Sequence, residues 1–193
     1  YTYNMAEASA LSTVCPYDLY HIGISFAREE RSAYEEITDR MLAVYGRLVR
    51  MYPPLGRVGQ AERYEMLKSL AGGRNRNTAQ LAILYMKLSY RRKSLVCLAS
   101  ARTACACSLV ERLDRKEKTL VFGEQIRQAQ ELCRLLESRY PGRVGQYHSG
   151  MGAQARRNVL ERFSTGEIRI LVTCRALDEG VDLPDVSVGI ILS

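Results

Sequence analysis

The chain has 193 residues, of which 47% are hydrophobic and 25% charged, and its 28 Lys and Arg exceed its 21 Asp and Glu. This composition is that of a folded globular chain with room for one substantial domain and an appendage, so we expect no extensive disorder. The longest uncharged apolar stretch, around residues 95–101, is well short of a membrane span, and the first five residues do not resemble a signal peptide. We therefore expect no membrane partner and a cytoplasmic location.

The first 115 residues have the pattern of a helical linker or extension. Apolar residues recur at spacings of three and four between residues 28 and 52, which predicts a helix ended by Pro53-Pro54. A short helix is predicted over residues 62–70, followed by a break at Gly72-Gly73. Asn77 or Thr78 is the expected N-cap of a long helical region that runs, with a possible interruption, to residue 115.

The excess of positive charge is local to this helical part. Residues 66–110 contain no acidic residue and eight basic ones, which are Lys68, Arg74, Arg76, Lys87, Arg91, Arg92, Lys93 and Arg102. A segment with charges of one sign repels itself and is stabilised by a polyanion such as a phosphate backbone. The alternative is a solvated helix face whose charge is balanced by acidic groups elsewhere in the protein.

From residue 116 onward, short strands alternate with helices. Strands are predicted over residues 119–122, 143–147, 168–173 and 186–192, and helices over residues 124–139 and 153–163. Strands separated by helices and short loops must pair in parallel through helical crossovers, so this part is predicted to have an α/β fold.

The six cysteines lie mostly in apolar stretches, so we expect buried free thiols rather than disulfides. Cys105 and Cys107 are the one close pair, and His21 and His148 are the only histidines. A zinc site needs two such pairs or matching histidines, so no metal site is predicted.

Polar and small residues gather where the predicted strands end. Gly123-Glu124, His148 and Thr173 lie at three strand ends, and residues 177–184 follow the third. Working residues of parallel sheets gather at this edge. Gly180 allows main chain to approach a ligand closely, and Asp182 can accept hydrogen bonds from a hydroxyl-bearing ligand or simply form a turn.

Four segments resemble, in order and spacing, motifs IV, IVa and V of the second RecA-like domain of superfamily 2 helicases. They are TLVF (119–122), YHSGM (147–151) with Arg156 and Phe163 following, ILVT (170–173) and EGVDLP (179–184). The acidic residue before GVDLP is most similar to DNA-repair and restriction-type members. More loosely, residues 6–17 and 26–37 resemble the linker between the two motor domains. The resemblance implies a RecA-like parallel sheet flanked by helices over residues 116–193, preceded by the mostly helical extension of residues 1–115.

The resemblance also implies roles for individual residues. Thr173 would bind a phosphate of the tracked strand, and Arg156 would contact the backbone or form an ion pair that orders the same edge, a plain surface salt bridge being the alternative. Gly180 and Asp182 would face the nucleotide held between the two motor domains. Arg91, Arg92 and Lys93 of the basic region are the further candidates for nucleic-acid binding. No catalytic residue is predicted, and His148 is expected to be a positioned strand-end residue.

Two motifs of a complete motor do not occur in the sequence. There is no G-x-x-x-x-G-K-[ST] loop to hold phosphates, and the arginine-rich motif VI is not reached before Ser193. We therefore expect the chain alone to be inactive, with ATP and Mg²⁺ bound in the intact protein mainly through the first motor domain.

The leading hypothesis is a fragment of an ATP-dependent superfamily 2 helicase or translocase whose partners are nucleic acid, DNA being favoured over RNA, and the first motor domain of the same protein. The alternative is a non-catalytic nucleic-acid-binding or protein-binding adaptor with a degenerate RecA-like domain.

Overall fold

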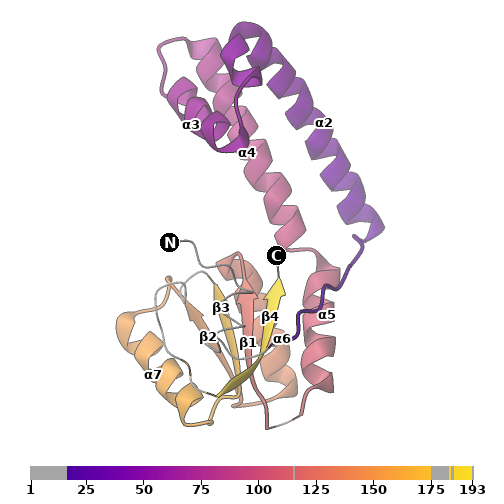
Figure 1. Ribbon diagram of the computed structural model, residues 1–193, viewed down its shortest axis with the longest axis vertical. Helices are drawn as coiled ribbons and strands as arrows, with labels where there is room; N and C mark the ends of the chain where they lie inside the picture. Colours follow the sequence, from indigo (N-terminus) through magenta and orange to yellow (C-terminus); the bar gives the residue numbers. More distant parts are fainter. Residues whose placement is uncertain (1–16, 115, 175–182, 184, 193) are drawn as a thin grey trace.

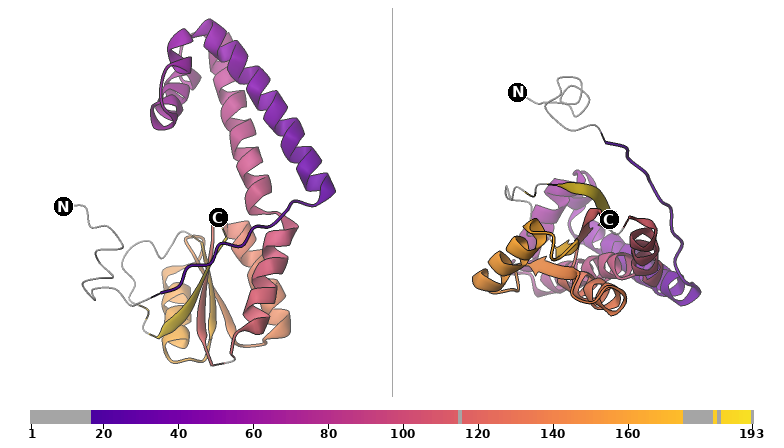
Figure 2. Two further views of the ribbon diagram at one scale, coloured as in Figure 1. Left: turned by 45° about the vertical axis from the view of Figure 1, so that its right-hand side comes forward. Right: turned by 90° about the horizontal axis from the view of Figure 1, so that it is seen from below.

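The structure is a computed structural model that describes residues 17–114, 116–174, 183 and 185–192. Figure 1 shows two parts, which are a layered sheet with helices on both faces and a long helical hairpin that projects from one edge of that sheet. Residues 17–27 run as an extended segment to the base of the hairpin (Figure 2).

The described residues form one sheet of four parallel strands, which confirms the predicted α/β fold. The strands are β1 (Lys118–Gly123), β2 (Val144–His148), β3 (Ile170–Cys174) and β4 (Val186–Leu192), in the order β2-β3-β1-β4. β3 and β1 are the central strands and read as continuous apolar runs, as expected for strands that are covered on both faces.

Successive residues of β1 point to opposite faces of the sheet and enter two different cores. Val121 packs with α5 (Ser100–Arg112) and α6 (Ile126–Arg139), whereas Leu120 packs with Phe163 of α7 (Ala153–Ser164). The turns before β2 and β3 contain Gly142 and Gly166, both with positive φ.

The predicted boundary between the helical extension and the α/β part lies after residue 115, which would place helix α5 in the extension. In the structure Ala106, Cys107 and Val110 of α5 lie in the core between the sheet and α6. Packing therefore groups α5 with the sheet and favours a boundary near residue 99.

The hairpin consists of α2 (Arg28–Met51), η1 (Pro53–Gly56), α3 (Gln60–Ala71) and α4 (Arg76–Cys97). It has its own core, in which Leu48, Leu55 and Leu67 are almost completely buried. The predicted N-cap of α4 was wrong: Asn75, not Asn77 or Thr78, caps the helix, because its side chain accepts hydrogen bonds from the backbone N–H groups of both those residues.

One helical stretch among the described residues, Arg76–Arg112, is long and apolar enough to cross a membrane by length and composition alone. The sequence contains no uncharged apolar stretch long enough to span a membrane. The stretch is divided into α4 and α5 at Leu98-Ala99, and its apolar residues serve two different cores. In its most apolar window, 33% of the stretch is buried inside the protein.

Candidate functional site at the carboxyl edge of the sheet

Thr173 lies at the carboxyl end of the central strand β3, in register with Tyr147 of β2 and Phe122 of β1. Its hydroxyl is expected to emerge at an open edge, but the residue is 0% exposed. Its Oγ1 atom has no hydrogen-bond partner among the described residues. Such a buried, unsatisfied hydroxyl is costly, so Thr173 could bind a phosphate only if its surroundings rearranged.

His148 ends β2, next to Cys174 of β3, on the opposite face of the sheet from Thr173. Its ring is buried, and neither ring nitrogen has a hydrogen-bond partner among the described residues. Gly150 packs against it: a Cβ atom at this position would lie 3.1 Å from His148 Nδ1. Two neighbouring strand ends thus place unsatisfied polar groups at the same edge.

Arg156 lies in the first half of α7 and is half-buried. It forms no ion pair within the described part of the chain, so the surface salt bridge considered above is not seen there. Gly180 and Asp182, the two residues predicted to face the nucleotide, lie outside the described residues.

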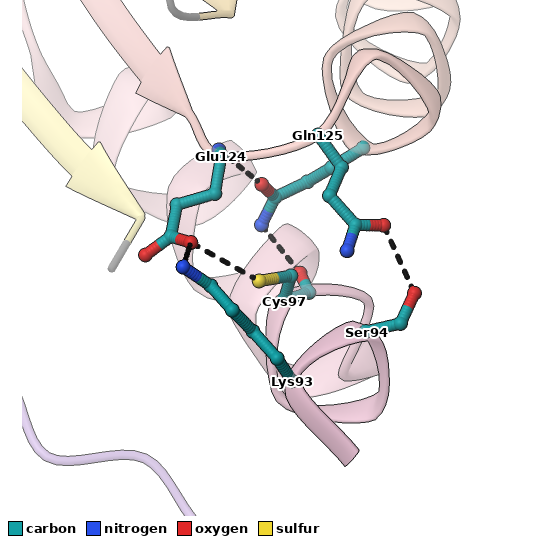
Figure 3. Close-up of polar contacts among 6 residues, drawn as sticks. Lys93, Ser94, Cys97, Glu124 and Gln125 are labelled. Atoms are coloured by element: carbon teal, nitrogen blue, oxygen red, sulfur yellow. Dashed lines mark hydrogen bonds and ion pairs between the residues drawn. The ribbon is translucent and has the colours of Figure 1, made fainter. Parts of the chain in front are cut away.

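A polar cluster joins the hairpin to this edge (Figure 3). We call it the hairpin-base cluster; its members are Lys93, Ser94 and Cys97 at the end of α4 with Glu124, Gln125 and Gln128 after β1. The end of β1 and the end of α4 are therefore held together directly.

Buried Gln128 is the centre of the cluster. Its Nε2 group donates to the backbone oxygen of Cys97, and its Oε1 atom accepts from the backbone N–H of Glu124 at 3.0 Å. The side chain thus satisfies one backbone group from each of the segments that meet here.

The Glu124 carboxylate lies 2.6 Å from Lys93 Nζ and accepts from Cys97 Sγ at 3.7 Å. Burial, and secondly the adjacent negative charge of Glu124, raise the pKa of the Cys97 thiol. Cys97 is therefore a neutral structural thiol, and like Cys105, Cys107 and Cys133 it forms no disulfide.

The three predicted nucleic-acid contacts on α4 have different surroundings. Lys93 is paired with Glu124, Arg92 stacks over the Tyr34 ring at 5.6 Å, and Arg91 is exposed. Two of the three cations thus have partners within the chain, and Arg91 has none among the described residues.

Helix α2, at the base of the hairpin, is hydrogen-bonded to α5. The Glu30 carboxylate of α2 accepts hydrogen bonds from the backbone N–H of Ser100, at 2.8 Å, and from that of Ala27, at 3.0 Å. The bond from Ser100 is the largest cause that lowers the pKa of Glu30. This carboxylate therefore caps α5 from a distance of 70 residues along the chain.

Glu30 and Gln128 are not among the site residues predicted from the sequence. Gln128 could have been found from the sequence, since it lies four residues before Leu132 on the apolar stripe of α6. A polar residue on such a stripe needs a hydrogen-bond partner. The sequence contains no comparable indication for Glu30, because its partner lies on a helix that only the tertiary structure brings near.

The described residues do not make up a complete site for ATP or Mg²⁺. They include no group of three or more His, Cys, Asp or Glu arranged to hold a metal ion, and the full sequence has no P-loop.

Comparison with known proteins finds a family model that matches this part of the chain. Residues 101–193, from α5 to the end of β4, match the helicase conserved C-terminal domain. The chain is 37% identical over 81 residues to UvrABC system protein B of Thermosynechococcus vestitus, covering 42% of this chain and 12% of the relative. It is 35% identical over 79 residues to an uncharacterized ATP-dependent helicase of Methanocaldococcus jannaschii, covering 40% of this chain and 12% of the relative.

Solved structures resemble the hairpin and the sheet together. The Sulfolobus solfataricus SWI2/SNF2 ATPase C-terminal domain superposes with a TM-score of 0.58 at 12% identity, over 87% of this chain and 68% of that one. The SWI2/SNF2 ATPase core of the same organism, in complex with dsDNA, gives a TM-score of 0.59 at 11% identity, over 88% of this chain and 33% of that one. At these identities the likeness is one of fold.

Proposed function

We propose that this chain is the linker and second motor lobe of an ATP-dependent superfamily 2 helicase or translocase that acts on DNA, of the repair or restriction type, in the cytoplasm. The proposal starts from the match of residues 101–193 to the helicase conserved C-terminal domain and from the RecA-like fold. The match of the whole sheet layer to that family is the observation that carries the proposal. The chain spans only 12% of the length of the curated relatives described above, so the remaining parts of the motor belong to the proposal.

The carboxyl edge of the sheet supports a role in binding phosphates. Arg156 is a half-buried cation without an ion pair among the described residues, and the Thr173 hydroxyl at the end of β3 has no hydrogen-bond partner there. Both are groups that a phosphate oxygen would satisfy. Gly180 and Asp182 keep their proposed role beside the nucleotide, and Arg91, Arg92 and Lys93 their proposed role beside the nucleic acid.

ATP and Mg²⁺ are assigned mainly to the first motor domain, because the described residues do not make up their site. What this chain contributes is a rigid surface: Gln128 and Glu124 fix the end of β1 to α4, so a shift of the sheet edge is passed directly to the hairpin. In the proposed motor, opening and closing of the two lobes moves the phosphate contacts and the hairpin as one body.

The proposal is tested by titrating the chain with fluorescein-labelled DNA and following anisotropy at several salt concentrations. Arg156→Gln should reduce the slope of log affinity against log salt by about 1, the value for one lost phosphate contact. Arg157→Gln is the matched control, since the exposed neighbour has the same charge and points elsewhere on α7.

Equal slopes for Arg156→Gln, Arg157→Gln and the unmodified chain would contradict the phosphate contact. Stronger binding to RNA than to DNA of the same sequence would contradict the assignment to DNA.

A further inference from the structure

Positive charge is concentrated at the far end of the hairpin. We define the hairpin tip as residues 40–76, which comprise the end of α2, η1, α3 and the start of α4, all distant from the sheet in Figure 1. The tip contains eight basic and two acidic residues, and one of the two acids, Glu65, is engaged by Lys68 at 2.9 Å. The tip is therefore strongly positive.

Five arginines of the tip are exposed and form no ion pair or side-chain hydrogen bond within the described ranges. They are Arg47, Arg50, Arg57, Arg74 and Arg76. At the base of the hairpin, by contrast, Lys93 and Arg92 have partners within the chain. Among the described residues, the tip therefore gathers five free arginines on one end of the hairpin, whereas at the base Arg91 alone of the three predicted contacts has no partner.

Nothing in the packing of the tip calls for these arginines. They lie outside the core that holds α2, α3 and α4 together, and Arg74 and Arg76 flank the N-cap of α4, where the helix dipole disfavours cations. Their mutual repulsion is relieved when a polyanion binds. Planar guanidinium groups can donate two hydrogen bonds to one phosphate, and a nucleic-acid backbone presents phosphates in a closely spaced row that can meet several arginines at once.

We propose that the hairpin tip is a second binding site for the phosphate backbone of duplex DNA, separate from the sheet edge. The inference rests on the proposed function, in which the sheet edge binds the same DNA. The 22 residues of α4 separate the two sites by about 33 Å at 1.5 Å per residue, which is close to one turn of B-DNA. A duplex of two turns can reach both sites at once, whereas a duplex of half a turn can reach only one.

The test compares three forms of the chain: unmodified, a tip variant with Arg50→Gln, Arg74→Gln and Arg76→Gln, and a control variant with Arg112→Gln, Lys116→Gln and Arg134→Gln. The control removes the same charge from exposed positions that lie away from the hairpin. Each form is titrated with duplexes of about 6 and about 24 base pairs across salt. The unmodified chain and the control variant should bind the longer duplex with a steeper salt slope than the shorter one, and the tip variant should lose about 2 to 3 from the slope on the longer duplex.

A tip variant that keeps the slope of the control variant overturns the inference, and so does binding of the chain to anionic lipid vesicles or to poly-glutamate in preference to duplex. If the tip variant loses slope while Arg156→Gln does not, the proposed sheet-edge contact fails and the tip site stands. If the tip variant matches the control variant while Arg156→Gln loses slope, the tip site fails and the sheet-edge contact stands. Absence of duplex binding by the unmodified chain overturns both.

Discussion

At the scale of single residues, Gly123 is needed because of what lies beside it. A Cβ atom at this position would lie 3.0 Å from Gln128 Oε1, and Gln128 is buried between two backbone groups that it satisfies. Gly123→Ala should displace the amide and leave those groups unpaired, lowering the free energy of unfolding by about 1–3 kcal/mol. Urea denaturation followed by circular dichroism measures this change.

Gly46→Ala is the matched control, because Gly46 lies inside α2 with no atom within 4 Å of the added Cβ. Replacing glycine by alanine in an exposed helix should raise the free energy of unfolding by up to about 1 kcal/mol. The prediction fails if both substitutions change stability in the same direction.

At the scale of elements, α2 is fastened to α5 through the Glu30 carboxylate, whose pKa is lowered chiefly by the hydrogen bond from the Ser100 backbone. Because the pKa is lower in the folded than in the unfolded protein, this stabilisation is present above the unfolded pKa and is lost as the pH falls through the folded one. Glu30→Gln should therefore be less stable than the unmodified chain at pH 7, and the difference should shrink below about pH 4.

Thermal unfolding at pH 7 and at pH 3 checks this prediction. Glu29→Gln is the control, since Glu29 is exposed in the same first turn of α2 and shares its helix-dipole interaction but makes no bond to α5. A pH dependence shared by both variants would assign the effect to the dipole instead.

At the scale of the whole molecule, two separate cores predict two units of stability. Leu48 is fully buried in the hairpin core, and Val172 is fully buried in the core beneath the sheet. Leu48→Ala should destabilise the hairpin by about 2–5 kcal/mol and speed amide exchange in α2 and α4, with β1 and β3 still protected. Hydrogen exchange read by mass spectrometry resolves the segments.

Val172→Ala is the reciprocal variant and should speed exchange in β1 and β3 before it affects α2. Equal loss of protection in both parts for either variant would mean that the hairpin-base cluster makes the molecule a single cooperative unit.

Local patterns were enough to predict most elements and the class of the protein. The alternation of apolar strands with amphipathic helices after residue 116 predicted all four described strands, since neighbouring residues decide strand and helix periodicity. The ordered segments at the strand ends predicted the helicase C-terminal domain, which the family match confirmed. The assignments of Thr173, Arg156, Gly180 and Asp182 to ligands stay predictions.

Only the tertiary structure decided which polar groups are engaged and which are free. Charge counted along the chain marked residues 66–110 as one basic segment, but folding pairs Lys93 with Glu124 at the base and leaves Arg74 and Arg76 exposed at the tip. Likewise the burial of Thr173 and the cap that Glu30 provides to Ser100 depend on partners from distant parts of the chain. Periodicity is a local property that sequence carries directly, whereas burial and pairing are set by contacts that exist only once the chain has folded.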